Sequence, residues 1–507
     1  MRKSFIMVLL ATVLVFSILL SSCTQDVANE STKPSETTKP SQSDISESSD
    51  TQPEITILFT KGGFDPPPAN DPIKQALEED SGIKFEQIAP PISDYAQKVN
   101  AILASGKDLP DIVKLPSYRD LFVYARQGAL LALDDWITEE KAPNILKIVP
   151  QSALDKCRVD GKLYAIPIWC SPHRYNFIIR GDWLDKLNLS EPKTLDDLYS
   201  VLKAFRENDP DGNGKKDTYG LCGQTFETFM AIFGAFGVVK DYWYEENGQL
   251  LPYNIHPDMK RALEYCRTLY KEGLVDPEWV STTTEAQLND KTMKNHFGAT
   301  AHWWTWEPKV EAEMKKVDPN VELRRIAPPV GPDGKSGLKG VPEINTVICV
   351  LSTTKNPEAC IKFMDYLHTE KGMLTQYTGV EGLHWEKKDD GTIVTLPQFD
   401  KDQKWIQWYS LFENENPLLL VETPLVQSRR DAFKWPVITN AADGIFTEAD
   451  LKYGTDLQAY VDEMFTKFIN GDVSLDQFDT FVQEWRQKGG DILIKEVNEM
   501  YKQRKTN

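Results

Sequence analysis

One short acidic segment carries the side chains best suited to binding a metal ion. Residues 209–217 read DPDGNGKKD, and their oxygen-bearing side chains follow the spacing of the first nine positions of an EF-hand calcium loop. Gly214 stands where the loop turns sharply, a position that needs a residue tolerant of positive φ. We expect a structural Ca²⁺ here, and the alternative is a solvated Asp/Asn/Gly turn without metal. The predicted ligands are Asp209, Asp211, Asn213, Asp217 and the backbone carbonyl of Lys215.

Tryptophan is the second residue type with recognisable chemistry, and the chain has 13 of them. Aromatic faces pack against the C–H faces of pyranose rings, while directed polar groups bind the hydroxyls. The densest cluster lies at residues 302–307, HWWTWE. If this stretch is extended, Trp304 and Trp306 share one face and Trp303 lies on the other. These side chains are candidates for sugar contacts, and the alternative for each is a place in the core.

The composition limits the classes of partner. The 507 residues are 41% hydrophobic, which is typical of a globular protein with two or three domains. Lys and Arg number 57 against 76 Asp and Glu, a formal net charge of −19. Nucleic-acid binding needs a basic surface, so we expect no nucleic-acid partner. The acidic excess suits neutral or cationic partners.

The amino terminus has the pattern of an export signal. Arg2 and Lys3 precede an apolar run over residues 5–20, which is shorter than the roughly 20 residues of a membrane span and suits a signal peptide. The run ends in LSSC at 20–23, which resembles the bacterial lipobox and implies cleavage before Cys23 and lipidation of its thiol. An ordinary signal peptide is the alternative. We therefore predict a signal peptide over 1–22, then the lipidated Cys23 and a disordered Ser/Thr-rich tether over 23–54.

The elements that must position these residues alternate between strands and helices. Residues 54–59 and 83–88 read as strands, a third strand begins near Pro110, and 71–80 and 94–105 read as helices. This alternation predicts a parallel α/β sheet. Apolar stripes within 259–270 and 457–468 predict two core-facing helices.

Six further cysteines allow up to three disulfides, but no Cys-x-x-Cys occurs. We expect scattered buried thiols because a body of this size needs no covalent staple. They are Cys157, Cys170, Cys222, Cys266, Cys349 and Cys360.

Several ordered segments resemble family 1 extracellular solute-binding proteins of ABC importers, in the long-chain branch that includes alginate- and oligosaccharide-binding lipoproteins. The segments are 104–112 (ASGKDLPDI), 164–167 (YAIP), 179–187 (IRGDWLDKL), 209–220 (DPDGNGKKDTYG) and 465–472 (FTKFINGD). In related proteins an acid after the ninth position often closes the calcium site, whereas this chain has Thr218 there and Gly220 at the twelfth position.

The resemblance implies a periplasmic-binding-protein-like α/β fold of two lobes with the ligand in the cleft between them. By analogy we expect lobe one at 54–165 plus 297–353 and lobe two at 166–296 plus 354–507. It implies a monomeric, lipid-anchored substrate-binding protein on the outer face of the cell membrane, in a Gram-positive envelope, that captures an oligosaccharide and delivers it to an ABC permease.

Other functions remain open on the residues alone. One alternative is a secreted polysaccharide-cleaving enzyme, and another is a binder of peptides or other polar solutes with the same fold. A third is a tethered sensor or adhesin that serves no transporter. The chain has no His-Glu-x-x-His and no Gly-x-Ser-x-Gly, and we expect no catalytic activity.

The resemblance also indicates the ligand contacts. Residues 302–306 fall where the family crosses between lobes and supplies a stacking Trp, for which Trp304 is the first candidate, with Trp303 and Trp306 beside it. Trp435 occupies the place of a second family stacking Trp. The remaining candidates are Lys61, Phe64, Ser117, Tyr118, Arg119, Trp169, His173, Phe226, Glu227 and Trp385.

Overall fold

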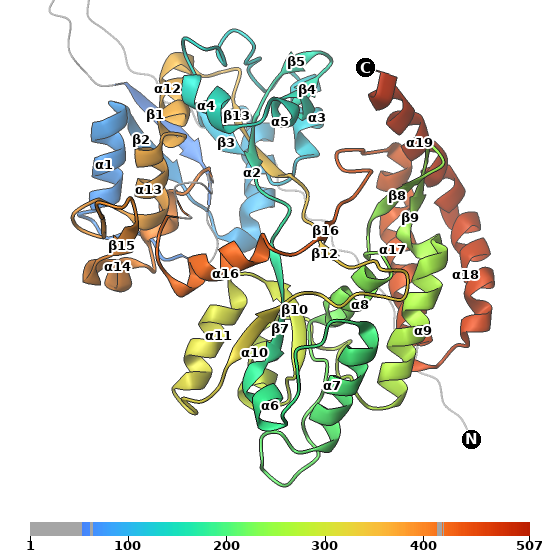
Figure 1. Cartoon of the computed structure of the whole chain (residues 1–507). Helices are drawn as coiled ribbons and strands as arrows, with labels where there is room; N and C mark the ends of the chain where they lie inside the picture. Colours follow the sequence, from blue (N-terminus) through green and yellow to red (C-terminus); the bar gives the residue numbers. More distant parts are fainter. Residues whose placement is uncertain (1–52, 61–63, 413–417, 419, 507) are drawn as a thin grey trace, which may run out of the picture. The chain divides into compact units, whose positions relative to one another are not determined.

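The computed structural model describes residues 53–60, 64–412, 418 and 420–506, which fold around two separate sheets (Figure 1). Each sheet has its own large hydrophobic core, so the described residues form two lobes. The predictions for the signal peptide, for Cys23 and for nearly all of the tether lie outside the described residues, as does Lys61.

The first lobe is built on a five-stranded sheet with the order β2-β1-β3-β13-β6. Strands β1, β2 and β3 are parallel, as the sequence predicts, and β13 runs antiparallel to both β3 and β6. The strands are β1 (Glu54–Leu58), β2 (Lys84–Ile88), β3 (Ile112–Lys114), β6 (Ile166–Trp169) and β13 (Ile344–Val350). The helices are α1 (Pro72–Ser81), α2 (Tyr95–Ser105), α3 (Asp120–Arg126), α4 (Pro143–Ile148), α5 (Gln151–Lys156), α12 (Pro357–Leu367) and α13 (Glu370–Thr378).

Local signals in the sequence explain where α1 begins and ends. The Asp71 side chain accepts a hydrogen bond from the backbone N–H of Ile73 at 2.9 Å, which caps the helix, and Pro72 fits its first turn. Gly82 follows the helix with φ +69°, the left-handed conformation that ends many helices.

The second lobe contains a three-stranded antiparallel sheet with the order β10-β7-β11. Buried side chains of α9 and α17 confirm the two apolar stripes seen in the sequence. The strands are β7 (Tyr175–Arg180), β10 (Ala299–Trp303), β11 (Leu323–Ile326) and the hairpin β8 (Trp243–Glu246) with β9 (Gln249–Pro252). The helices are α6 (Gly181–Lys186), α7 (Leu195–Glu207), α8 (Met230–Ala235), α9 (Pro257–Lys271), α10 (Glu285–Met293), α11 (Trp306–Lys315), α17 (Glu448–Asn470), α18 (Phe478–Trp485) and α19 (Asp491–Thr506).

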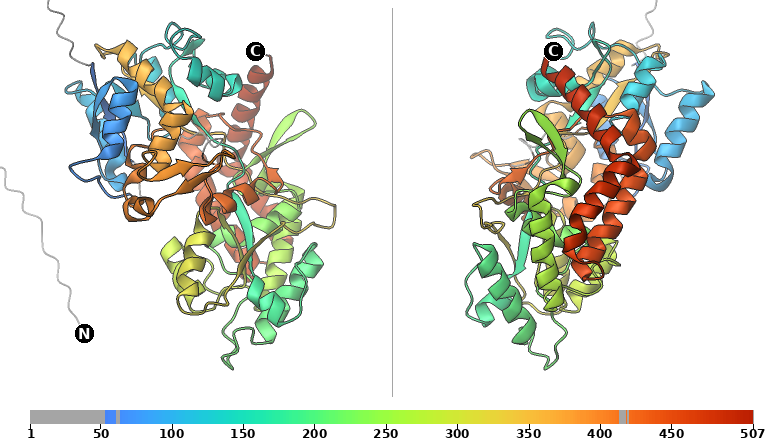
Figure 2. Two further views of the ribbon diagram at one scale, coloured as in Figure 1. Left: turned by 60° about the vertical axis from the view of Figure 1, so that its left-hand side comes forward. Right: turned by 90° about the vertical axis from the view of Figure 1, so that its right-hand side faces the viewer.

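Helices from distant parts of the sequence lie side by side in the second lobe. The right-hand view of Figure 2 shows α9, in green, beside the red carboxyl-terminal helices α17 to α19. Leu263 of α9, Phe465 of α17 and Val497 of α19 belong to the same core, so the carboxyl-terminal helix packs within this lobe.

The segments between the lobes correct the predicted boundaries. We expected 297–353 in lobe one, but β10 and β11 flank β7 in the second sheet, and only β13 reaches the first. We expected 354–507 in lobe two, but α12 and α13 contribute Phe363 and Met373 to the core of the first. The boundaries taken from the resembled family are wrong because a segment belongs to the lobe whose strands it pairs with, and the sequence does not show that pairing. At the junction, β12 (Leu338–Lys339) runs parallel to β16 (Val437–Ile438).

A small satellite lies between α13 and the junction. It contains β14 (Trp385–Lys387), β15 (Ile393–Thr395), α14 (Pro397–Asp402) and α16 (Pro424–Ala432). Val426 of α16 packs against the core of this satellite, which includes Leu374 of α13 in the first lobe, and α16 also contacts β7 and α11 of the second lobe. Helix α16 therefore touches both lobes.

All six described cysteines are buried and none is in a disulfide, in agreement with the expectation of buried thiols. Across the described part of the chain, no helix is both long and apolar enough to cross a membrane.

Candidate ligand-binding site

One edge of the second sheet collects several loop segments. Leu221 forms parallel bridges with both Ala299 of β10 and Val275, so the chain leaves all three at the same edge. The segments that follow are 222–229, 276–282 and 303–306. Ligands of parallel α/β folds bind outside the carboxyl ends of the strands, so this edge is a candidate ligand-binding site.

Aromatic rings and two guanidinium groups gather where β10 ends. Trp303 meets the Tyr175 ring edge to face, with 5.5 Å between the centroids, and the Arg174 guanidinium lies 5.9 Å from the Trp303 ring. The Arg429 guanidinium lies 5.7 Å from the Trp304 ring and 4.4 Å from the Phe433 ring. We call this group the aromatic cluster: Arg174, Tyr175, Trp303, Trp304, Arg429, Phe433 and Trp435.

Trp304 is held by its backbone and keeps part of its ring accessible. Its N–H donates to the carbonyl of Arg174 at 2.9 Å, and its carbonyl accepts from the Ser428 hydroxyl of α16 at 2.8 Å. The ring is half-buried, and its Nε1 is buried without a hydrogen-bond partner among the described residues. A fixed indole whose ring is partly accessible can offer a flat apolar face to a ligand.

The structure brings Trp435 to the same place. Its Nε1 donates to Oδ1 of Asn176 at 3.1 Å, and Nδ2 of Asn176 donates to the Ser428 hydroxyl at 2.9 Å. Ser428 therefore links the two tryptophans chosen from the sequence. Asn176, Ser428 and Arg429 carry no local sequence signal of this role because their partners are far away in the chain.

Phe226 and Glu227 also lie at this edge, beside a cavity of about 720 Å³. They belong to the 3₁₀ helix η2 (Thr225–Phe229), and the Tyr175 hydroxyl donates to Oε1 of Glu227 at 3.3 Å. Burial raises the pKa of the Glu227 carboxyl, although the bond from Tyr175 lowers it. Tyr175 of the aromatic cluster thus donates a hydrogen bond to a residue that lines the cavity.

His302 ties β10 to the segment that precedes η2. Its Nε2 lies 2.8 Å from Oε1 of Gln224, and its ring packs on that of Trp306 with 4.8 Å between centroids. Burial lowers the pKa of His302 to about 4, so the ring is neutral at pH 7. A neutral imidazole can then donate from Nε2 to the Gln224 carbonyl.

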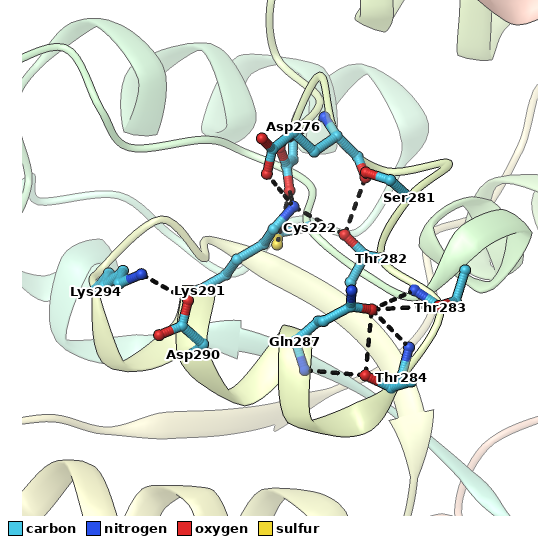
Figure 3. A network of polar contacts seen from close by, with 11 residues as sticks. Cys222, Asp276, Ser281, Thr282, Thr283, Thr284, Gln287, Asp290, Lys291 and Lys294 are labelled. Carbon is cyan, nitrogen blue, oxygen red and sulfur yellow. Dashed lines mark hydrogen bonds and ion pairs between the residues drawn. The ribbon is translucent and has the colours of Figure 1, made fainter.

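A polar network beneath the edge fixes the 276–282 turn (Figure 3). Nζ of Lys291 on α10 is 2.5 Å from Oδ2 of Asp276, 2.8 Å from Oγ1 of Thr282 and 3.1 Å from Oε2 of Glu278. Burial alone would lower the pKa of Lys291, but its hydrogen bond and ion pair with Asp276 outweigh that effect and raise it. The Cys222 thiol lies 3.6 Å from the same carboxylate, and burial raises its pKa, so it is a neutral hydrogen-bond donor.

Two of the predicted tryptophans are core residues, and those predictions are wrong. Trp306 is 1% exposed and donates from Nε1 to Asn289 at 2.7 Å. It begins α11, so the alternation of an extended strand stops at Trp303. Trp385 is 3% exposed and donates to the Gly379 carbonyl at 2.7 Å.

Of the three candidates next to α3, one is buried in the core and two are partly accessible. Tyr118 is 7% exposed, packs against Phe122 and Phe446, and donates to the Lys156 carbonyl, so its assignment to the ligand is also wrong. Ser117 and Arg119 are half-buried, and their ligand contacts stay predictions.

The other candidates remain accessible. His173 faces the Phe433 ring with 5.7 Å between centroids, and burial together with the Arg429 charge lowers its pKa. Trp169 and Phe64 are half-buried. Their contacts with a ligand stay predictions.

The loop at 209–217 carries oxygen donors that fit a calcium ion. Nδ2 of Asn213 lies 2.7 Å from Oδ2 of Asp211 and 3.2 Å from Oδ1 of Asp217, so these side chains converge. The Asp209 carboxylate accepts from the backbone N–H of Gly214 at 2.9 Å, which winds the loop. Burial and the adjacent Asp209 raise the pKa of Asp211, a crowding of carboxyl groups that a cation would relieve.

Two features separate this loop from a complete EF-hand. Thr218 turns inward and donates to the Phe205 carbonyl at 2.7 Å, and a Cβ on Gly220 would lie 2.6 Å from that of Leu202. No acid can therefore stand at the twelfth position. No three acidic, Cys or His side chains of the described residues gather closely enough to hold a metal by themselves. Asparagine and carbonyl oxygens would have to contribute.

Two α/β lobes joined by crossing segments, with an aromatic cluster at the junction, define the class of two-lobed solute-binding proteins. The model of the bacterial extracellular solute-binding protein family matches residues 65–374, and the chain belongs to that family.

Similar proteins cover nearly the whole chain. The lipoprotein LipO of Bacillus subtilis (strain 168) is 28% identical over 87% of this chain and 90% of its own length. The polygalacturonan/rhamnogalacturonan-binding protein YtcQ of the same organism is 27% identical over 87% of this chain and 89% of its own.

Solved structures agree on the fold. The alginate-binding protein AlgQ2 without calcium ion has a TM-score of 0.68 at 22% identity, covering 90% of this chain and 99% of its own. An EF-hand mutant of FusA, an ABC-transporter substrate-binding protein of Streptococcus pneumoniae, in complex with fructo-nystose has a TM-score of 0.67 at 20% identity, covering 90% and 100%. The two-lobed α/β fold predicted from the sequence is therefore confirmed.

Proposed function

We propose that this protein captures an oligosaccharide for an ABC importer and delivers it to a separate membrane permease. The observation that carries the proposal is the aromatic cluster, in which half-buried Trp303, Trp304 and Trp435 surround polar groups at the lobe junction. Flat rings with nearby hydrogen-bonding groups suit sugar rings. The similar polygalacturonan/rhamnogalacturonan-binding protein YtcQ and the similar FusA structure in complex with fructo-nystose support the same class of ligand.

The two-lobed architecture gives the proposal a mechanism. A ligand seated between the lobes favours the arrangement in which both lobes contact it, because it shifts a conformational equilibrium only by its difference in affinity for the two states. Helix α16 touches both lobes and bears Ser428 and Arg429 of the site. A ligand that contacts these two residues can therefore affect how the two lobes are arranged. We propose binding without catalysis and a monomer as the binding unit.

A thermal-shift screen of the purified protein tests the proposal. The panel holds neutral and acidic oligosaccharides, tripeptides and amino acids. A ligand at 100 times its dissociation constant adds about 2.7 kcal/mol to stability if it binds only the folded state. We expect a shift with an oligosaccharide. Shifts with peptides alone, or release of sugar fragments from any oligosaccharide, would refute the proposal.

We also propose that the 209–217 loop binds a structural Ca²⁺ through Asp209, Asp211, Asn213, Asp217 and the Lys215 carbonyl. The convergent oxygens of this loop support the proposal. The similar structures of AlgQ2 without calcium ion and of an EF-hand mutant of FusA support it as well. Ca²⁺ prefers such oxygen ligands. We expect a chelator to lower the melting temperature and added Ca²⁺ to restore it. Asp211→Asn should lose this response, whereas the exposed control Asp389→Asn should keep it. The absence of bound calcium by elemental analysis, with no chelator effect, would contradict the proposal.

The final part of the proposal concerns location. We propose that lipidated Cys23 holds the protein on the outer face of a Gram-positive membrane, which the lipobox pattern and the lipoprotein relative LipO support. Metabolic labelling with a palmitate analogue tests it. Cys23→Ala should remove the label and release the protein into the medium, and an unlabelled wild-type protein would refute it.

A further inference from the structure

The cavity beside η2 lies next to the aromatic cluster but has walls of its own. Phe226, Trp279 and Val280 are apolar residues of its lining, and α17 contributes Asp462, Glu463 and other polar residues. Its volume of about 720 Å³ lies within the range of ligand pockets. Glu227 lines this cavity and also receives the hydrogen bond from Tyr175, whose ring meets Trp303. Tyr175 therefore contacts both a residue of the cavity lining and a ring of the aromatic cluster.

The cations of the cavity are already engaged by acids. Lys240 lies 2.9 Å from Asp241 and 3.0 Å from Asp462, and Lys339 lies 3.5 Å from Asp241. Lys467, the third lysine of the lining, lies 2.5 Å from Glu463. An incoming carboxylate would have to compete with these acids for each ammonium group.

The acids outnumber those cations. The lining contains three lysines and five acids: Glu227, Asp241, Asp462, Glu463 and Asp472. Carboxylates are acceptors for hydroxyl donors, and such charge-assisted hydrogen bonds are stronger than neutral ones. A carboxylate on the ligand would instead meet like charges at short range, which disfavours binding. The apolar residues Phe226 and Val280 suit the C–H face of a sugar.

We infer that this cavity is an extension of the proposed carbohydrate site that receives an uncharged sugar unit and rejects a uronate. The inference rests on the proposed function and deepens it, because it selects between neutral and acidic glycans. The ligand spans the aromatic cluster and the cavity, with its hydroxyls directed to Glu227 and its apolar face toward Val280.

Matched ligands and a matched pair of variants test this inference. Isothermal titration compares trigalacturonate with its carboxyl-reduced counterpart galactotriose, alongside kestose and mannotriose. Val280→Trp fills the cavity from a position that is 41% exposed, and Val317→Trp adds the same side chain at a site that is 79% exposed and outside the cavity lining. Both changes are on the surface, so both variants should fold, which circular dichroism checks.

We expect at least one neutral trisaccharide to bind, with at least tenfold weaker affinity in Val280→Trp and unchanged affinity in Val317→Trp. Glu227→Gln should weaken the same ligand about threefold or more, because the charge-assisted acceptor is lost.

Three other results would each overturn part of this inference. Tighter binding of trigalacturonate than of galactotriose, or a gain in trigalacturonate affinity in Glu227→Gln, would overturn the neutral class. Binding of a neutral sugar that Val280→Trp leaves intact would overturn the cavity as its place. If no carbohydrate binds, the proposed function itself fails and this inference fails with it.

Discussion

Acidification should destabilise the protein through His302, the histidine that ties β10 to the binding edge. Its imidazole is buried, and its Nε2 is engaged by Gln224. Protonation would place a charge in the core, where burial disfavours it more than the backbone hydrogen bond with Trp303 favours it. The pKa of His302 accordingly falls from the ordinary 6.5 to about 4.

The sign and size of the effect follow from linkage. Between pH 6.5 and pH 4 the unfolded chain binds a proton at this histidine and the folded chain does not, so stability falls as the pH falls. The loss relative to pH 7.5 is about 1.4 kcal/mol at pH 5.5 and about 2.5 kcal/mol at pH 4.5. These values apply to His302 alone.

The assay is urea unfolding of the wild type and of His302→Gln from pH 7.5 to pH 4.5, followed by tryptophan fluorescence. Glutamine keeps a donor toward Gln224 but cannot titrate. Any loss of packing in the variant then changes its free energy of unfolding by the same amount at every pH. The titration of other groups contributes equally to both proteins and cancels when the two free energies are subtracted. We expect the stability difference to shift in favour of the variant by about 2.5 kcal/mol between pH 7.5 and pH 4.5. A difference that stays constant over this range would show that His302 is not held neutral by burial.

Two further predictions concern the site and the packing behind it. Trp304→Ala and Trp435→Ala should each weaken oligosaccharide binding at least tenfold, about 1.4 kcal/mol, without loss of fold, and unchanged calorimetric affinity in both would remove the aromatic cluster as the site. Gly234→Ala should destabilise the protein by about 1–3 kcal/mol or more because its Cβ would lie 1.8 Å from the carbonyl oxygen of Gly337, although alanine favours a helix. Gly454→Ala on α17 is the control, since its Cβ meets only a movable side-chain oxygen, and it should be neutral or stabilising by up to about 1 kcal/mol in the same unfolding assay.

Much of the local structure could be predicted because its causes are local. Asp71, Pro72 and Gly82 delimit α1 through contacts within a few residues, and the strand before it was predicted to within one residue of β1. The apolar stripe of α17 follows from the period of the helix alone. The ordered segments that resemble solute-binding proteins likewise indicated the family, which the family model over residues 65–374 confirms.

The predictions that failed depended on contacts between distant segments. The sequence could not tell that β10 pairs with β7, and the assumed boundary at 297 was wrong for that reason. Trp306 and Trp385 have the same chemistry as Trp304, but one enters a helix and the other a satellite core. An indole contributes to a core or to a binding surface according to what covers it, and residues far away in the chain supply that cover.

The sequence by itself therefore determined the elements, the family and the types of side chain available for binding. Only the tertiary structure decided which of them meet: Trp304 and Trp435 become neighbours through Ser428 and Asn176, and Glu227 joins them through Tyr175. The physical reason is one of range. Capping and periodicity act over a few residues of chain, whereas burial, cavity shape and hydrogen-bond partners arise only when the two sheets and the segments between them have packed.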